Sequence, residues 1–247
     1  MNIALAGYGK MGHEVEAVAK ARGHEVVVTF DIDRPLSPDS IRSLKPDVII
    51  DFTQPDAVMT NVRVATKAGL PIVIGTTGWD AEVTKVEKMV AEAQTACVFA
   101  SNFSIGVNIF LKIVADASKL LHGADYDVYI TEAHHNTKKD FPSGTALRIS
   151  EAVLSGFKSK SKVVSQLKQG EAPAKDSILV SSIRAGSITG KHTVGFDSEV
   201  DSIELTHEAK SRRGFALGAV RAAEWIVGKK GMYRFEDNLT EIVGTKK

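Results

Sequence analysis

Short apolar runs alternate with helical stripes over the first hundred residues. Strands are predicted at Asn2–Ala6, Glu25–Phe30, Val48–Asp51, Pro71–Ile74 and Ala96–Ala100. Between these runs apolar residues recur at helical spacing, as in Met11–Arg22 and in the segment after Asp80, which is expected to cap a helix. Nearly continuous apolar strands that alternate with helices are typical of a parallel sheet covered on both faces. The pattern therefore predicts a doubly wound α/β domain.

The pattern changes after residue 104. Helices are predicted at Ile105–Leu121, Thr145–Leu154 and Gly214–Val227, and strands at Tyr126–Glu132, Ile178–Arg184, His192–Phe196 and Ser202–Ala209. The polar stretch Lys158–Ala174 is predicted to be a solvated loop. Because several strands follow one another without helices, we expect a mixed or antiparallel sheet in a smaller α+β domain. This domain would span residues 105–213, inserted between residues 1–104 and 214–247 of the α/β domain.

Length and charge agree with this interpretation. The chain has 247 residues, enough for one large or two modest domains. Its 31 basic and 30 acidic side chains give a net charge of +1, which argues against a nucleic-acid partner. No apolar run approaches the ~18 residues of a membrane helix, so no membrane partner is expected. The single cysteine, Cys97, is expected to be a buried thiol, and with no signal-peptide pattern a cytoplasmic location is predicted.

A glycine-rich turn joins the first predicted strand to the first predicted helix. Its residues are Gly7, Tyr8, Gly9, Lys10, Met11 and Gly12, a G-x-G-x-x-G sequence. Such glycines allow a tight turn, a close approach of the backbone to a pyrophosphate, and close packing of the helix on the strand. The first helical N–H groups would hold the phosphate charge, so the domain is predicted to be a Rossmann-type dinucleotide-binding domain. The alternative is a glycine turn that serves packing alone.

Asp31 bears on the choice of dinucleotide. It closes the second predicted strand 19 residues after Gly12, where an acidic side chain is expected to accept hydrogen bonds from the adenosine ribose. Its charge disfavours a 2′-phosphate, whereas Arg34 could swing to meet one. We therefore predict that NADH is preferred and that NADPH remains possible.

Two further segments follow strands of the α/β domain. They are Gly75, Thr76, Thr77 and Gly78, and Phe99, Ala100, Ser101 and Asn102. Ligands bind at the carboxyl ends of parallel strands, so both segments are candidates for holding the nicotinamide half of a dinucleotide. Each is also compatible with an ordinary turn.

The stretch over residues 132–145, EAHHNTKKDFPSGT, is the densest in chemically active side chains. His134 can give a proton near neutral pH, and Lys138 supplies a fixed positive charge. Gly144 and Thr145 begin a predicted helix whose N–H groups could bind an anion. These groups suit a small substrate with carboxylates that must accept a proton; a solvated loop with a helix cap is the alternative. Adjacent histidines in an extended chain point in opposite directions and no H-E-x-x-H pattern occurs, so no metal site is expected.

Taken together, these segments resemble the 4-hydroxy-tetrahydrodipicolinate reductase family, also called dihydrodipicolinate reductases, of bacterial lysine and diaminopimelate synthesis. The resemblance is carried by the glycine turn, Asp51-Phe52-Thr53, Gly75-Thr76-Thr77-Gly78, Ser101-Asn102-Phe103-Ser104, the Glu132–Ala146 loop and Ser211-Arg212-Arg213-Gly214-Phe215-Ala216. It implies an oxidoreductase that transfers a hydride from the nicotinamide C4 of NAD(P)H to a cyclic, dicarboxylate substrate. It also implies a homotetramer that pairs the sheets of its substrate domains.

The same resemblance implies roles for individual residues. His134 would be the proton donor, and Lys138 would take part in catalysis and in substrate binding. The dicarboxylate would be held by His135, Gly144 and Thr145. The cofactor would be held by Gly7–Gly12, Asp31, Gly75–Thr77 and Phe99–Asn102.

Three features depart from the family pattern. The glycine turn is one residue shorter than the commoner form, and Phe141 stands where alanine is usual. Ile32 follows Asp31 where NADPH-using relatives often have arginine, which supports the NADH prediction. Two other functions stay open: another Rossmann-type amino-acid oxidoreductase, and a non-catalytic NADH-sensing regulator, which would need no proton donor.

Overall fold

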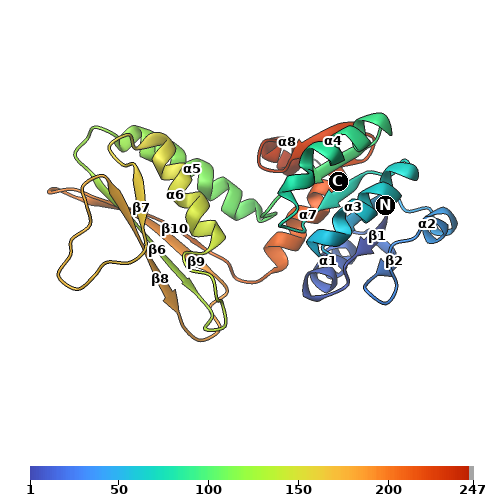
Figure 1. Ribbon diagram of the computed structural model, residues 1–247, viewed down its shortest axis with the longest axis horizontal. Coiled ribbons are helices and arrows are strands. Elements are labelled where there is room, and N and C mark those ends of the chain that lie inside the picture. Colours follow the sequence, from blue (N-terminus) through green and yellow to red (C-terminus); the bar gives the residue numbers. More distant parts are fainter. Residues whose placement is uncertain (245–247) are drawn as a thin grey trace. The chain divides into compact units, whose positions relative to one another are not determined.

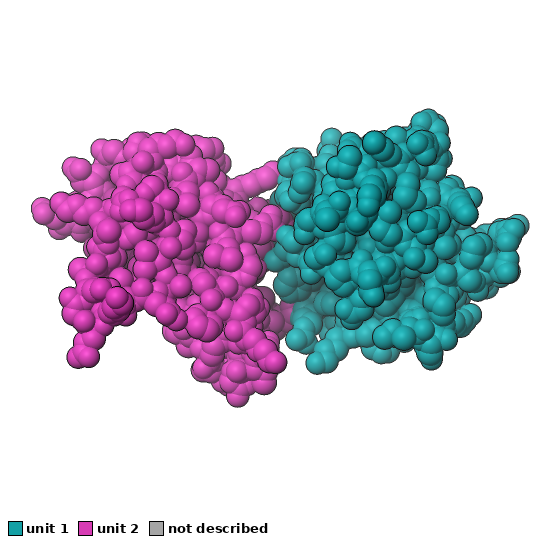
Figure 2. All heavy atoms as spheres, viewed as in Figure 1, with its two compact units in different colours: residues 1–105, 212–247 teal, residues 106–211 magenta. Residues whose placement is uncertain are grey.

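The computed structural model describes residues 1–244 and divides into two compact units (Figure 1). Unit 1 comprises Met1–Ile105 and the C-terminal segment from Arg212 onward, and unit 2 comprises Gly106–Ser211 (Figure 2). The chain therefore leaves unit 1 once, builds unit 2, and returns. Among residues 1–244, no helix combines the length and the apolar character needed to span a bilayer.

Unit 1 is built on a six-stranded parallel sheet in the order β11-β5-β4-β3-β1-β2. Its strands are β1 (Asn2–Ala6), β2 (Glu25–Phe30), β3 (Val48–Asp51), β4 (Ile72–Ile74), β5 (Ala96–Phe99) and β11 (Gly231–Arg234). The central strands are buried on both faces, as their continuous apolar runs require. This sheet is the predicted Rossmann-type doubly wound architecture.

Helices cover both faces of that sheet. One face carries α1 (Lys10–Ala21), α7 (Arg213–Ile226) and α8 (Leu239–Gly244), which share one apolar core. The other carries α2 (Pro38–Leu44), α3 (Pro55–Lys67) and α4 (Val83–Glu92), preceded by the 3₁₀ turn η1 (Asp80–Glu82). Cys97 on β5 is fully buried, as predicted, and burial raises the pKa of its thiol.

Unit 2 contains a five-stranded mixed sheet in the order β10-β9-β6-β8-β7. Its strands are β6 (Asp127–His134), β7 (Lys162–Val164), β8 (Ser177–Arg184), β9 (Lys191–Asp197) and β10 (Ser202–Glu208). β6 pairs in parallel with β8 and antiparallel with β9. The helices α5 (Ile105–Leu121) and α6 (Gly144–Gly156) lie on one face, where Val114, Ile149 and Val153 pack onto Ile130 and Val194 (Figure 1).

The predicted elements differ from the structure in a few places. The loop predicted for Lys158–Ala174 contains β7, an edge strand with two of its three residues exposed and therefore without an apolar pattern. Asp80 does not cap a helix; it begins η1, and α4 follows. α2, β11 and α8 were not predicted because they are short. A signal for α2 was nonetheless present, since Ser37 caps it and Pro38 occupies its first turn.

Candidate functional site

The glycine turn between β1 and α1 has the geometry of a phosphate-binding loop. Gly7 has a positive φ of 86°, and a Cβ there would lie 2.3 Å from the carbonyl oxygen of Phe52. A Cβ on Gly12 would lie 2.4 Å from the carbonyl oxygen of Gly7. Gly9 is the N-cap of α1 and has no side chain with which to cap it. The backbone N–H groups of the first turn are thus left for an anion, which fits a dinucleotide pyrophosphate.

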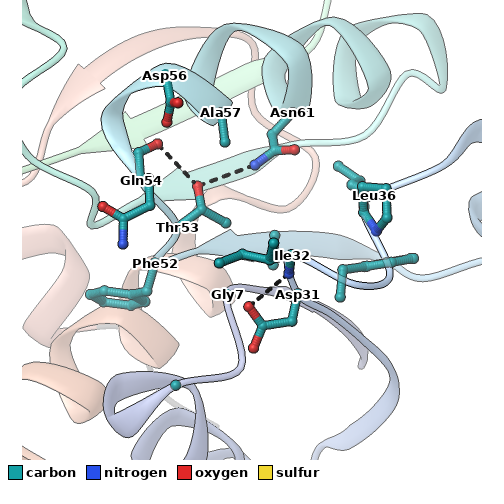
Figure 3. A pocket seen from close by; sticks show the side chains of 14 residues that line it. Gly7, Asp31, Ile32, Leu36, Phe52, Thr53, Gln54, Asp56, Ala57 and Asn61 are labelled. Carbon is teal, nitrogen blue, oxygen red and sulfur yellow. Dashed lines mark hydrogen bonds between the residues drawn. The ribbon is translucent and has the colours of Figure 1, made fainter.

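A cavity of about 460 Å³ adjoins this turn at the carboxyl ends of the first strands (Figure 3). It is lined by Ala6, Gly7, Gly9, Phe30, Asp31, Ile32, Pro35, Leu36, Phe52, Thr53, Gln54, Asp56, Ala57 and Asn61. Three predicted residues, Gly7, Gly9 and Asp31, therefore lie together, whereas Tyr8, Lys10, Met11 and Gly12 do not line it. The cavity is large enough for the adenosine half of a dinucleotide.

Asp31 lies at the edge of the cavity and keeps its carboxylate close to its own loop. Its Oδ1 accepts a hydrogen bond of 2.9 Å from the backbone N–H of Ile32 (Figure 3). The backbones of Asp31 and Arg34 exchange two 3.0 Å hydrogen bonds that close the loop. The guanidinium of Arg34 lies 5.9 Å from the ring centre of Phe30. Ile32 is 90% exposed, so an apolar rather than a basic side chain stands beside the carboxylate.

A second cavity, of about 280 Å³, lies in the same unit. Its lining residues are Met11, Phe52, Gly75, Ser101, Asn102, Phe103, Arg212 and Phe215. Four predicted residues meet there: Met11, Gly75, Ser101 and Asn102. Phe52 lines both cavities, and a Cβ on Gly75 would lie 2.2 Å from its ring, so glycine is required beneath that ring.

The remaining predicted cofactor residues lie around these cavities rather than in them. The hydroxyl of Thr76 is buried and donates to the Asp51 carboxylate at 2.9 Å. That carboxylate also accepts from the backbone of Thr53 at 2.8 Å and from Asn61 at 2.9 Å. The fully buried Asp51 thus ties together the loops that follow β3 and β4. Thr77 is exposed.

The last two predicted cofactor residues are Phe99, which ends β5, and Ala100, which follows it. The Phe99 ring meets the Trp79 ring edge-on at 5.4 Å and lies 5.0 Å from the guanidinium carbon of Arg234. Ala100 is buried. Phe52, Arg212 and Phe215 also line the second cavity. They were not predicted as site residues, although all three lie in segments that carry the family resemblance.

In unit 2 the predicted proton donor lies at the end of a strand, against a buried carboxylate. His134 is the last residue of β6, and its Nδ1 lies 2.5 Å from Oε2 of Glu132. The other oxygen, Oε1, accepts from Nη2 of Arg184 at 2.7 Å. The ring of His192, from β9, meets the His134 ring edge-on at 5.1 Å. Three neighbouring strands therefore build the surroundings of His134.

The start of α6 is joined to this cluster. Ser143 caps the helix by accepting from the Ala146 N–H at 3.2 Å, and Gly144 and Thr145 lie in a first turn without acidic residues. The Ser143 hydroxyl also lies 3.3 Å from Nε2 of His192, and its backbone N–H donates to Oε1 of Glu132 at 3.3 Å. All three links are buried.

The loop between β6 and α6 carries the remaining predicted residues. Nζ of Lys138 lies 2.8 Å from Oδ1 of Asp140, and the hydrogen bond from Lys138 lowers the pKa of that carboxyl. Nδ1 of His135 lies 2.7 Å from the Thr137 hydroxyl. Arg184 donates to the carbonyl oxygen of Asp140 at 2.6 Å, which attaches the loop to β8.

Burial and charge set the protonation of the two histidines. Burial lowers the pKa of His134; the Glu132 charge opposes this, while Lys138 and Arg184 add to it, and the pKa lies below its ordinary value. Burial and the neighbouring His134 lower the pKa of His192 to about 4. His192 is therefore neutral at physiological pH.

Glu132, His134 and His192 offer ligand atoms within 4.8 Å of one another, although no metal site was expected from the sequence. The trio could not be foreseen because its members come from two strands. The guanidinium of Arg184, 2.7 Å from the same carboxylate, opposes the binding of a second cation. The Glu132 carboxylate of this cluster is therefore already paired with a cation.

A parallel Rossmann-type sheet, and a second unit in which a buried histidine and a lysine lie near a helix N-terminus, are typical of dinucleotide-dependent oxidoreductases. The chain matches the family models "Dihydrodipicolinate reductase, N-terminus" over residues 1–103 and "Dihydrodipicolinate reductase, C-terminus" over residues 106–239. The chain belongs to the dihydrodipicolinate reductase family.

Individual members of the family are similar to this chain over nearly its full length. A 4-hydroxy-tetrahydrodipicolinate reductase of Christiangramia forsetii is 39% identical over 98% of this chain and 99% of its own. The Archaeoglobus fulgidus enzyme of that name is 41% identical over 97% of this chain and 100% of its own. A solved dipicolinate-bound dihydrodipicolinate reductase from Paenisporosarcina sp. TG-14 has a TM-score of 0.77 and 25% identity, covering 96% of this chain and 98% of its own. The family resemblance and the fold expected from the sequence are confirmed.

Proposed function

We propose that this chain catalyses the NAD(P)H-dependent reduction of 4-hydroxy-tetrahydrodipicolinate to tetrahydrodipicolinate, a step of lysine and diaminopimelate synthesis. Relatives 39% and 41% identical over nearly the whole chain carry the name of this reductase. The observation that carries the proposal is the cluster in unit 2, where His134, Lys138 and the start of α6 lie together. It combines a proton donor, a fixed cation and anion-binding N–H groups. A dicarboxylate substrate that must accept a proton needs these three kinds of group.

The 4-hydroxyl group of the substrate leaves as water to give a conjugated cyclic imine, and the reduced nicotinamide, when bound, supplies the hydride to a ring carbon of that imine. We propose that unit 1 holds the cofactor through the glycine turn, Asp31 and the residues around the two cavities. NADH is the preferred form in this proposal, because the Asp31 carboxylate repels a 2′-phosphate and Ile32 offers it no positive charge. NADPH remains usable through Arg34.

The residues of unit 2 complete the reduction. Lys138 and the N–H groups of Gly144 and Thr145 bind the substrate carboxylates, with His135 beside them, and this positive environment makes the ring a better hydride acceptor. As the hydride arrives, charge develops on the neighbouring carbon, and His134 delivers a proton there. The substrate carboxylates bring negative charge close to His134 and raise its pKa, which favours the imidazolium that must donate.

A coupled assay tests the function. The purified chain is mixed with the product of the preceding synthase and with NADH or NADPH, and loss of the reduced-nicotinamide absorbance is followed. We expect turnover that depends on the synthase product, with a higher kcat/KM for NADH. Cofactor oxidation that does not require the synthase product would contradict the proposed substrate, and a large NADPH preference would contradict the role of Asp31.

We further propose a cytoplasmic homotetramer. The helices of unit 2 lie on one face of its five-stranded sheet. The opposite face bears the half-exposed Ile183 and Tyr129, whose hydroxyl donates a hydrogen bond to Glu204 at 2.8 Å. A sheet face that lies opposite the helices and bears an exposed apolar side chain is suited to pairing with a second copy.

A further inference from the structure

Glu132 is a buried carboxylate that the proposed reaction does not use directly. It lies two residues before His134 on β6, so both side chains project from the face of the sheet that packs against the helices. Its side chain is 0% exposed. A buried carboxylate is costly unless charges and hydrogen bonds surround it, so its partners indicate its role.

Three elements supply those partners. Arg184 on β8 donates to Oε1 at 2.7 Å, and the Ser143 N–H, just before α6, donates to the same oxygen at 3.3 Å. Oε2 lies 2.5 Å from Nδ1 of His134. Burial alone would raise the pKa of Glu132, but the hydrogen bonds from Arg184 and its other partners outweigh it, and the pKa lies below its ordinary value. The group is an anion at neutral pH.

A permanent anion at Nδ1 decides which nitrogen of His134 exchanges its proton. We expect Nδ1 to keep its hydrogen in both charge states, because Oε2 of this permanent anion lies 2.5 Å from it. Nε2 is then the nitrogen that gains and loses the proton. It lies beside Gly190, where a Cβ would stand 3.1 Å away, so the absence of a side chain at position 190 keeps this nitrogen uncrowded.

The other groups that face the pair do not offer Nδ1 a competing anion. The charged and titratable groups around His134 and its neighbour His192 are Glu132, Arg184, Lys138 with its partner Asp140, and His207. Two of them are cations that act against protonation of His134, and Asp140 is paired with one of these. Glu132 is accordingly the group that favours protonation of His134 in the free protein, against burial and the two cations.

We infer that Glu132 is a positioning residue that fixes the Nδ1–H tautomer of His134, directs the transferable proton to Nε2, and ties the start of α6 to the same carboxylate through Ser143. One side chain thus sets both the proton donor and the anion-binding helix turn. The inference deepens the proposed function and rests on it, because it assumes that His134 gives the proton.

Glu132→Gln tests the electrostatic part of the inference. The amide removes the charge, so the pKa of His134 should fall by about one to three units, as for loss of an opposite charge at this separation. Activity requires the protonated ring, so the limb on which kcat declines with rising pH should move to lower pH by a similar amount. Glu132→Asp keeps the charge and should restore that limb while leaving kcat reduced. A purely structural role would lower the yield of folded protein without moving the limb, and that result would overturn the inference.

A double variant tests whether Glu132 acts through His134. Glu132→Gln combined with His134→Gln should be no slower than His134→Gln alone, since the positioning residue then has nothing to position. Fully additive losses would overturn the inference.

A spectroscopic measurement separates this inference from the proposed function. Nitrogen NMR of the full chain with labelled histidines, with His134 assigned by its loss in His134→Gln, reports the tautomer without substrate. The Nδ1–H tautomer is expected in the wild type and should be lost or mixed in Glu132→Gln. An Nε2–H tautomer in the wild type would overturn the inference even if the reductase assay succeeds. An Nδ1–H tautomer in a chain that fails the assay would refute the proposed reaction alone.

Discussion

The surroundings of His134 disfavour the protonated form that the proposed reaction needs. Burial and two nearby cations hold its pKa below the ordinary value, and the adjacent carboxylate of Glu132 only partly offsets them. In the free protein at neutral pH the ring is therefore mostly neutral. Substrate carboxylates add the negative charge that the site lacks, so binding and proton uptake are expected to be linked.

His134→Gln should lower kcat by about 10²- to 10⁴-fold, the usual effect of removing a positioned acid, with a much smaller change in KM. In the wild type kcat should fall as pH rises through the pKa of His134 in the complex, and the variant should lack this limb. Steady-state kinetics over a pH series measure both. His122→Gln, a ring that contacts Phe157 elsewhere in unit 2, is the control and should behave like the wild type. Near-normal turnover of His134→Gln would refute the assignment.

Lys138 and Lys139 form a matched pair for testing carboxylate binding. Lys138 is half-buried and already holds Asp140 at 2.8 Å, whereas Lys139 is exposed. Lys138→Ala should lower kcat/KM by about 10- to 100-fold, the loss of one hydrogen bond to a charged group, with KM and kcat both affected. Lys139→Ala should leave both constants within about twofold of the wild type. Equal effects of the two substitutions would point to general electrostatic attraction instead.

One carboxylate on α7 links that helix to the end of α1, beside the apolar core that they share. Glu224 on α7 accepts from Arg22, which follows α1, at 2.7 and 2.8 Å, and lies 2.7 Å from Nε2 of His24. Burial alone would raise the pKa of Glu224, but the hydrogen bonds from Arg22 and His24 outweigh it and hold the pKa below its usual 4.5. The stabilisation is therefore present above the ordinary carboxyl range and is lost as pH falls through the depressed pKa.

Glu224→Gln should reduce the free energy of unfolding by about 1–3 kcal/mol at neutral pH, because Arg22 loses a charged acceptor in a mostly buried position. As pH falls through the depressed pKa of Glu224, the difference from the wild type should shrink, since the wild-type carboxyl is then being protonated. Urea unfolding at several pH values measures both effects. The exposed Glu87→Gln on α4 should change stability by less than about 0.5 kcal/mol. A pH-independent difference would show that the carboxylate charge is not what joins the helices.

The sequence predicted most elements of both units because strong apolar periodicity accompanies them. The strands β1 to β5, the helix α5 and the strands β8 to β10 all lie within a residue or two of their predicted bounds. Short or weakly apolar elements were not predicted. Two of the three residues of β7 are exposed, and β11 is at most half-buried. Their pairing with distant strands, which no local pattern encodes, is what fixes them.

The residues of the candidate site likewise divide into those that one stretch of sequence predicts and those that come from distant strands. His134, Lys138, Gly144 and Thr145 fall in one stretch of sequence, so their chemistry could be predicted together. Arg184 reaches the cluster only because β6 pairs in parallel with β8, which sets it opposite His134. The antiparallel pairing of β6 with β9 places His192 opposite Glu132 in the same way. Such long-range registers could not be read from local spacing.

Three separate apolar clusters, two in unit 1 and one in unit 2, account for the two-unit organisation of the chain. Unit 1 buries both faces of its sheet, whereas α5 and α6 cover one face of the unit 2 sheet. Alternation along β8 then places Ile178 and Val180 in the core and Leu179 and Ile183 on the other face. Ile183 is 53% exposed in the single chain. This apolar residue lies on the sheet face through which the proposed homotetramer would pair.

Ile183→Glu should therefore convert the proposed tetramer into smaller species, because four copies of a buried charge cannot be solvated at a paired sheet face. Light scattering coupled to size-exclusion chromatography measures the mass. Ile32→Glu, a 90% exposed position in unit 1, introduces the same charge away from this face and should leave the mass unchanged. A monomeric wild type, or a tetramer that survives Ile183→Glu, would reject this face as the interface. If the mass falls while turnover per chain persists, each chain carries a complete site; if both fall, assembly is needed to hold β6 and α6 in register.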